Sequence, residues 1–214
     1  MGSSRNGPVL VCFAVREEAA PFRRGLPSTV TVLVSGMGAA AAERATNEKL
    51  AERDWRMVLT CGFAGGLNPA LPIGAVLCEA DENFPLHQAL LGAGALAGRF
   101  HCAERVAVTA YEKATLRERT GADAVEMESG IIRRLCRERG IPSATVRVIS
   151  DTAQEDLPLD FNALMKPNGK LSLGRLARDV LRRPRELPAL MALGRQTKLA
   201  ARNLAVVLRA ALTR

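Results

Sequence analysis

The 214-residue sequence has few aromatic residues, few histidines and no long apolar run. Aromatic side chains make up 4% of the chain, and His87 and His101 are its two histidines. Because zinc sites are built mainly from His and Cys, and the five cysteines stand singly, we expect no metal, no cofactor and no disulfide framework. No apolar run approaches the roughly 18 residues of a membrane span. The first eight residues lack the apolar core of a signal peptide. We therefore expect a cytoplasmic protein.

Positive charge is concentrated in the last quarter of the chain. Residues 166–214 contain three Lys and nine Arg against Asp179 and Glu186, a net charge of +10, whereas the whole chain carries +8. Residues 1–165 are therefore slightly acidic. A chain with 48% apolar residues and this length forms one domain with or without an appendage. We predict a domain over residues 8–165 and a basic helical tail over residues 166–214.

Short apolar runs alternate with polar, helix-favouring segments over the first two thirds of the chain. This alternation indicates an α/β layered fold with a largely parallel central sheet. Residues 83–104 have weak periodicity, and we expect a loop or short helix there. The predicted strands span residues 8–14, 29–34, 56–60, 74–79, 105–109 and 143–149, and the predicted helices span residues 16–20, 39–53 and 128–139.

The tail contains two amphipathic helical stretches, residues 171–181 and 187–212, separated by Pro184 and Pro188. A basic amphipathic helix can lie on an anionic membrane surface. It can also pack on the domain and leave its basic face in solvent, which is the commoner case. Nucleic-acid binding is not expected, because the tail has no aromatic residue on which a base could stack.

Glycines and polar residues gather at the ends of the predicted strands, at Ser35–Gly38, Gly62–Gly66, Glu126–Glu128 and Ser150–Asp151. In open α/β sheets, ligands bind outside the carboxyl ends of the strands. The first of these segments opens a helix, whose N-terminus can hold an anion. Each segment also has a plain structural interpretation as a tight turn or a helix cap.

The acidic segment is harder to explain by structure alone. Alternation sends Glu126 and Glu128 to one side and Met127 to the other. Two carboxylates beside a crevice cost desolvation free energy unless they bind something. The alternative is a solvated acidic turn before a helix. Asp151, which closes an apolar strand, could likewise be the N-cap of the next element.

Together these motifs resemble the purine nucleoside phosphorylase and nucleosidase superfamily, and within it the methylthioadenosine/S-adenosylhomocysteine nucleosidase branch. The resemblance rests on Val125–Glu128 followed by a helix and Val146–Asp151, with Gly62–Leu67, Ser35–Gly36 and Arg16–Glu18 in matching order. The segment from Asp156 to Asn162 and the tail are most similar to the hopanoid-associated phosphorylase group. The resemblance implies a three-layer αβα fold with a central, largely parallel mixed sheet, plus basic C-terminal helices.

The resemblance also implies roles for individual residues in cleaving an N-glycosidic bond. Asp151 matches the acid that protonates purine N7, and Glu18 matches the residue that positions a nucleophilic water. Glu128 matches the acid that binds the ribose 2′- and 3′-hydroxyls, while Met127 packs against the sugar. Arg147 is expected to be structural. The further substrate-binding residues expected are Glu126, Ser35, Gly36, Gly62, Phe63, Ala64 and Ser150.

Departures from the family pattern bear on the substrate. Phe63 stands where the family usually has a small polar residue, which makes the floor near the nucleophile more apolar. The stretch from Cys78 to Arg105 is shorter than in the family, which favours an open pocket such as a bulky 5′ substituent would require. The hopanoid-associated group implies adenosylhopane, in hopanoid biosynthesis. Three side chains are further candidates for lining the pocket, namely Phe84, His87 and Tyr111.

The acceptor and the assembly stay open at this point. Glu18 favours water, whereas phosphate as co-substrate would need cations such as Arg16, Arg23 or Arg24. The resemblance implies a homo-oligomer, with a dimer favoured, that acts on a small-molecule nucleoside, and the tail suggests peripheral contact with the inner membrane. The alternatives are a methylthioadenosine/S-adenosylhomocysteine-type nucleosidase, a non-catalytic nucleoside-binding protein and a membrane-surface protein.

Overall fold

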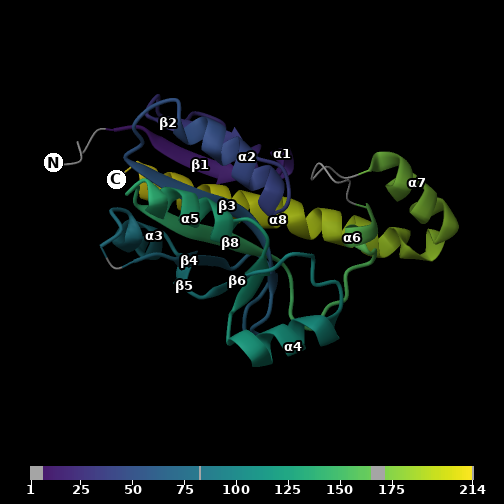
Figure 1. The fold of residues 1–214 in the computed structure, drawn as a ribbon. Coiled ribbons are helices and arrows are strands. Elements are labelled where there is room, and N and C mark those ends of the chain that lie inside the picture. Colours follow the sequence, from purple (N-terminus) through teal and green to yellow (C-terminus); the bar gives the residue numbers. More distant parts are fainter. Residues whose placement is uncertain (1–6, 82, 165–171, 214) are drawn as a thin grey trace.

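The computed structural model describes residues 7–81, 83–164 and 172–213 (Figure 1). Their strands form an eight-stranded mixed sheet with the order β2-β1-β3-β8-β4-β5. β1 pairs in parallel with β2 and β3, and β3 pairs in parallel with β8, whereas β4 runs antiparallel to β8. The far end of β3 pairs with β7, which pairs with β6. The strands are β1 (Val9–Phe13), β2 (Val30–Val34), β3 (Met57–Gly66), β4 (Val76–Glu79), β5 (Leu96–Ala97), β6 (Phe100–Cys102), β7 (Ala124–Glu126) and β8 (Ser143–Asp151).

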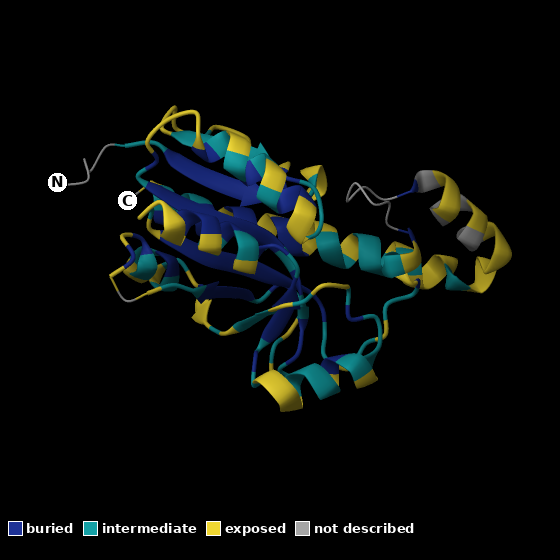
Figure 2. Ribbon diagram, viewed as in Figure 1, coloured by how far each residue is buried: buried dark blue, intermediate teal, exposed yellow. Residues whose placement is uncertain are grey.

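Helices cover both faces of the sheet, which confirms the three-layer αβα prediction. They are α1 (Arg16–Ala19), α2 (Ala39–Leu50), α3 (His87–Gly92), α4 (Ala110–Thr120), α5 (Ser129–Glu138), α6 (Phe161–Leu164), α7 (Leu173–Arg182), a short 3₁₀ turn (Pro184–Glu186) and α8 (Leu187–Leu212). Side chains alternate across β1, so Leu10 belongs to the buried cluster that includes residues of α2 and α5, while Val11 belongs to the cluster that includes residues of α1, α3 and α8. Figure 2 shows the sheet buried between these two layers.

The predicted strand at residues 105–109 is wrong. This segment joins no sheet, and several of its backbone groups are bonded to side chains. The side chain of Asn162 accepts from Val106 N and donates to Val106 O, at 2.8 and 3.0 Å. The Val108 N–H donates to the carboxylate of Glu112, at 2.7 Å. The segment therefore ends as the cap of α4, which sequence analysis did not predict.

The glycine-rich stretch after the third predicted strand continues that strand. β3 runs on to Gly66 and stays paired with β8 through a bulge after Ala64. The stretch at residues 83–104 contains α3, β5 and β6, where a loop or a single short helix was expected.

Strand β8 runs to Asp151. Asp151 is therefore the last residue of a strand, whereas the alternative interpretation of the sequence made it a helix cap.

Helix α8 has two halves with different surroundings. Its second half lies in the core beneath the sheet and is buried through residues such as Ala200, Leu204 and Leu208. Asn203 donates to Gly74 O at 3.1 Å, and Arg209 donates to Phe22 O at 3.2 Å. Its first half extends from the body together with α7 (Figure 1). We call residues 172–199 the arm. Leu171, where a tail helix was predicted to start, lies outside the described residues.

Candidate active site

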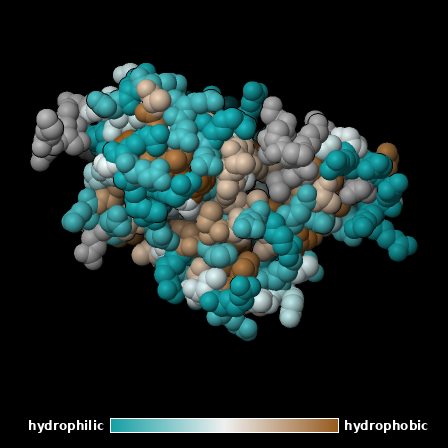
Figure 3. Space-filling view, in the orientation of Figure 1, coloured by the Kyte–Doolittle hydropathy of each residue, from teal (hydrophilic) through white to brown (hydrophobic). Residues whose placement is uncertain are grey.

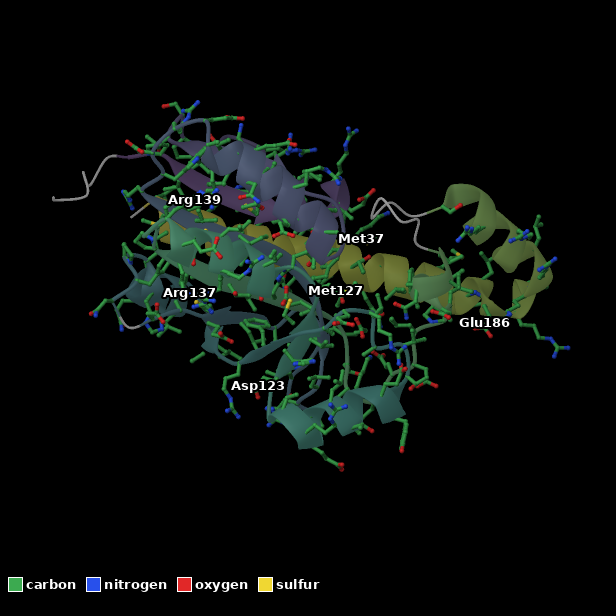
Figure 4. The ribbon with its side chains drawn as sticks, in the orientation of Figure 1. Met37, Asp123, Met127, Arg137, Arg139 and Glu186 are labelled. Atoms are coloured by element: carbon green, nitrogen blue, oxygen red, sulfur yellow. The ribbon has the colours of Figure 1, made fainter. Side chains whose placement is uncertain are left out.

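A cavity of about 250 Å³ opens at the carboxyl ends of β1, β2, β3 and β8. Its polar wall comes from strand ends and from the acidic segment, and its apolar wall comes from the segment before α4, from the region around α6 and from α8. Met37 and Met127, labelled in Figure 4, contribute from the loop after β2 and from the link between β7 and α5. The lining residues are Val15, Glu18, Met37, Phe63, Ala64, Gly65, Arg105, Val106, Ala107, Val125, Glu126, Met127, Glu128, Ser150, Asp151, Leu157, Phe161, Leu193 and Thr197.

Glu18 is a buried carboxylate held by backbone donors. The N–H groups of Ala14 and Val15 donate to its Oε2 at 2.9 and 3.1 Å, and the Phe63 N–H donates to Oε1 at 2.8 Å. Burial raises the pKa of Glu18 to about 7, against the lowering effect of Arg147 and the backbone donors. A group with this pKa, fixed at a cavity wall, suits general acid–base chemistry near neutral pH.

Two more carboxylates meet on one guanidinium. Nη2 of Arg147 lies 2.6 Å from Glu126 Oε2 and 3.2 Å from Glu128 Oε2, and all three residues are buried. Glu126 and Glu128 thus share one partner, but Met127, which alternation was predicted to send to the other side, lines the same cavity, because β7 ends at Glu126. Burial works to raise the pKa of Glu126, but Arg147 and the bonds from Ser129 hold it below its usual value. Burial raises the pKa of Glu128, and the charge of Glu126 adds to this effect.

The turn before α2 holds Glu128 in place. The N–H of Gly38, the N-cap of α2, donates to Glu128 Oε1 at 2.9 Å. The sequence predicted that this helix N-terminus could hold an anion, and the anion it binds within the chain is the carboxylate of Glu128. Gly38 has φ +81°, a left-handed conformation that favours glycine.

Asp151 lies at the end of β8 with a cation behind it. Its Oδ1 accepts a hydrogen bond from Ser150 Oγ at 2.7 Å, and its Oδ2 lies 2.6 Å from Nζ of Lys113 on α4. Lys113 is fully buried. Sequence analysis missed Lys113, because it stands in an otherwise ordinary polar helix with no local pattern that connects it to Asp151.

The predicted site residues are distributed as follows. Eight of them line the cavity, namely Asp151, Glu18, Glu128, Met127, Glu126, Phe63, Ala64 and Ser150. Ser35, Gly36 and Gly62 are outside the lining. The Ser35 hydroxyl donates to Phe13 O at 3.2 Å and so braces the turn, and a Cβ at Gly36 would lie 3.0 Å from that of Ala41.

The other candidate lining residues lie elsewhere. Phe84 is buried in the core, and Tyr111 is 82% exposed on α4. His87 is the first residue of α3 and is absent from the lining. The apolar lining from Val106, Leu157, Phe161 and Leu193 was not predicted, because these residues meet only through tertiary packing. Within the described residues, no group of three or more His, Cys, Asp or Glu is arranged to hold a metal ion.

Comparison with known proteins gives a matching family and several solved structures with a similar fold. The profile of the phosphorylase superfamily matches residues 13–82 and 87–182. The fold is similar to a futalosine hydrolase mutant of Helicobacter pylori, with a TM-score of 0.70, 17% identity and coverage of 97% of this chain and 99% of that one. It is also similar to an H. pylori 5′-methylthioadenosine/S-adenosylhomocysteine nucleosidase mutant with 5′-methylthioadenosine in the active site (TM-score 0.71, 17% identity, 100% and 99% covered). The Neisseria meningitidis nucleosidase in complex with methylthio-immucillin-A gives a TM-score of 0.68 at 19% identity, with 96% and 98% covered.

Proposed function

Because the chain belongs to the phosphorylase superfamily, and is an enzyme of its nucleosidase or phosphorylase kind, we propose that it hydrolyses the N-glycosidic bond of an adenine nucleoside. The observation that carries this proposal is that Glu18, Glu128 and Asp151 line one cavity. Such a cleavage passes through a ribosyl cation and a departing base. A site for it must stabilise positive charge on the sugar and supply a proton to the base.

The two ends of the proposed reaction fall to different residues of the polar wall. Asp151 would serve the base, and Glu128 would bind the ribose hydroxyls beside Met127. Glu18, Glu126 and Glu128 together face one buried guanidinium, Arg147, so the carboxylates outnumber the cation. A local excess of negative charge in a buried site stabilises the developing ribosyl cation.

We propose water as the acceptor. Glu18 is in the lining, and its pKa of about 7 suits a base that activates water. A phosphate acceptor would need cations in the cavity. Arg16, Arg23 and Arg24 are exposed and absent from its lining, and Arg105 is the one Lys or Arg among the lining residues in the described part of the chain. This distribution supports hydrolysis.

We further propose a large apolar 5′ substituent, of which adenosylhopane is the example that the sequence suggested. The support is the apolar wall, where Phe161 and Leu193 face the cavity. Leu193 lies on the arm, so this wall continues into the first half of α8. Figure 3 shows apolar residues near the middle of the viewed face, where the body meets the arm.

The arm supports the proposed contact with a membrane. Four large apolar side chains are exposed there, Leu181 by 82%, Leu187 by 46%, Met191 by 57% and Leu199 by 53%. Exposed arginines, at 182, 183 and 185, accompany them. Cations beside exposed apolar residues are the combination that an anionic lipid surface binds. In the described part of the chain, no helix is both long and apolar enough to span a bilayer.

The substrate proposal is tested with adenine nucleosides of increasing 5′ size. We expect kcat/KM for adenine release to rise from adenosine to methylthioadenosine to a 5′-alkyl adenosine. Leu193→Gln should abolish this gain, whereas Leu199→Gln, which changes an exposed residue of the same helix outside the cavity lining, should preserve it. Equal rates for all three substrates would remove the case for a large 5′ group.

The membrane proposal is tested by co-sedimentation with vesicles that contain phosphatidylglycerol. The triple variant Leu181→Gln/Leu187→Gln/Met191→Gln should lose binding. Val206→Gln, which changes a 66% exposed residue in the second half of α8, is the matched control and should still bind. Binding by the triple variant at the wild-type level would contradict the proposal.

A further inference from the structure

Lys113 is buried behind Asp151 and is held there by two hydrogen bonds and one ion pair. Its side chain is 0% exposed. Nζ lies 2.6 Å from Asp151 Oδ2 and donates to the carbonyl oxygens of Thr152 and Glu155, both at 2.8 Å. The ammonium group therefore has two hydrogen-bonded carbonyls and one ion-paired carboxylate around it. The lysine therefore fits its site as a protonated group.

The surroundings of Lys113 are arranged around this contact. The side chain of Glu155 accepts from Thr152 N at 2.9 Å and closes the turn that presents the two carbonyls. Across the pair lies Gly65, where a Cβ would come within 3.2 Å of Asp151 Oδ2 and 3.8 Å of Lys113 Cε. A larger residue at position 65 would crowd the carboxylate that faces the cavity.

Anchoring of α4 does not by itself explain a buried ammonium. The helix is already capped by Thr109 and Glu112, and Arg117 joins it to Asp123 at 2.7 Å. Burying an ion pair costs desolvation, and a well-packed apolar residue often serves stability equally well. What distinguishes Lys113 is its partner. Two of its neighbours are backbone carbonyls, which do not take up protons, and the third is a carboxylate, which can accept one.

We propose that Lys113 supplies the proton that Asp151 passes to the departing base. This inference rests on the proposed function and deepens it. As the bond between C1′ and N9 breaks, its electron pair moves to the base. A proton moves from Nζ of Lys113 to the carboxylate of Asp151, and Asp151 passes a proton on to the base. The products at this end of the site are a neutral base, an Asp151 carboxylate and a neutral Lys113 amine, while water adds to the ribosyl cation and gives its proton to Glu18. Asp151, which lines the cavity, then takes a proton from water and passes it to Lys113, which restores the ion pair before the next turnover.

Because Lys113 acts through Asp151, it is a positioning residue, and its test needs a readout that loss of packing would not change. Two substrates give that readout. An adenine nucleoside needs a proton on its leaving group, whereas 4-nitrophenyl β-D-ribofuranoside releases 4-nitrophenolate without one. We expect Lys113→Met to lower kcat/KM for the adenine nucleoside at least 100-fold and for the nitrophenyl riboside less than tenfold.

Two further variants separate proton supply from charge and packing. Lys113→Arg keeps the cation, but a guanidinium does not release its proton in proteins. This variant should show the same selective loss. In the Asp151→Asn background, Lys113→Met should lower the rate on the adenine nucleoside less than threefold, because the two residues act in one step. Arg117→Met, on the same helix, is the control for disturbance of α4.

The outcomes are separable. Equal losses on both substrates, full activity in Lys113→Arg, or additive losses in the double variant would overturn the role of Lys113. Melting curves identify a variant that fails to fold, and the comparison then rests on Lys113→Arg and on the double variant, which removes both charges. If Asp151→Asn keeps the wild-type rate on the adenine nucleoside, the proposed acid itself is wrong. If it loses that rate while folded Lys113 variants keep theirs, only this inference fails.

Discussion

Glu18 and Arg147 lie on two sides of Gly62. A Cβ at Gly62 would come within 2.6 Å of Glu18 Oε1 and 2.7 Å of Arg147 Nη1. Gly62 also has φ +146°, which L side chains rarely adopt. The absence of a side chain at this position of β3 is therefore what allows the carboxylate and the guanidinium to approach each other beneath the cavity.

Gly62→Ala should displace Glu18 and reduce activity. We expect kcat/KM to fall at least 100-fold, because an added methyl group cannot share the gap with either group, and the free energy of unfolding to fall by about 1–3 kcal/mol. Gly94→Ala is the matched control, since Gly94 also has positive φ (+100°), but a Cβ there would meet nothing within 4 Å. A Gly62→Ala enzyme with wild-type kcat/KM would show that the position of Glu18 is not critical.

Activity should depend on the ionisation of Glu18. A base acts only when it is deprotonated, and burial raises the pKa of Glu18 to about 7. The kcat/KM for adenine release should therefore rise tenfold per pH unit below about pH 7 and level off above it. Glu18→Gln should lose most of the activity and this limb of the profile. A wild-type profile that is flat between pH 5 and 8 would contradict the assignment.

The same group should make stability depend on pH, with the opposite trend. The folded pKa of about 7 exceeds the ordinary value of 4.5, so the folded state binds the proton more tightly than the unfolded state. The stabilisation is complete below about pH 4.5 and is lost as the pH rises through 7. At 1.36 kcal/mol per unit, the loss is about 3 kcal/mol. Denaturant titrations of wild type and Glu18→Gln from pH 4 to 8 should differ by this pH-dependent amount.

Arg147 should be required for the fold as well as for the site. Arg147→Met leaves Glu126 and Glu128 buried without their cation, and breaking a buried pair of this kind costs about 3–5 kcal/mol. Arg134→Met is the control, because Arg134 is half exposed and pairs with Glu43 and Glu138 at the surface, where such pairs contribute about 0–1 kcal/mol. Similar unfolding midpoints for both variants would contradict this account.

Much of the fold could be predicted from local sequence. β1, β2 and α5 follow apolar runs and helical spacing that are complete within each segment, so their bounds agree within a few residues. The segment at 105–109 misled the prediction, since its β-branched residues favour a strand, while its hydrogen bonds go to Asn162 and Glu112. These hydrogen bonds depend on the tertiary structure, which the local sequence does not show.

The site residues that belong to recognisable sequence motifs could be predicted. Glu18, Glu128 and Asp151 stand at strand ends or beside them, in an order that resembles a known family, and all three line the cavity. Lys113 and Leu193 could not be found this way. The sequence pattern of each helix does not show whether these residues face solvent, the core or the cavity. Only the packing of α4 and α8 in the folded chain brings them to the cavity.

The central claim, hydrolysis of an adenine nucleoside, is tested most directly by release of free adenine. Purified protein is incubated with adenosine, methylthioadenosine and a 5′-alkyl adenosine, with and without phosphate, beside Asp151→Asn. We predict that adenine is released without phosphate, at an unchanged rate when phosphate is added, and that Asp151→Asn loses this release. Release that requires phosphate would contradict the role of Glu18, and no release from any of the three nucleosides would contradict the proposed activity.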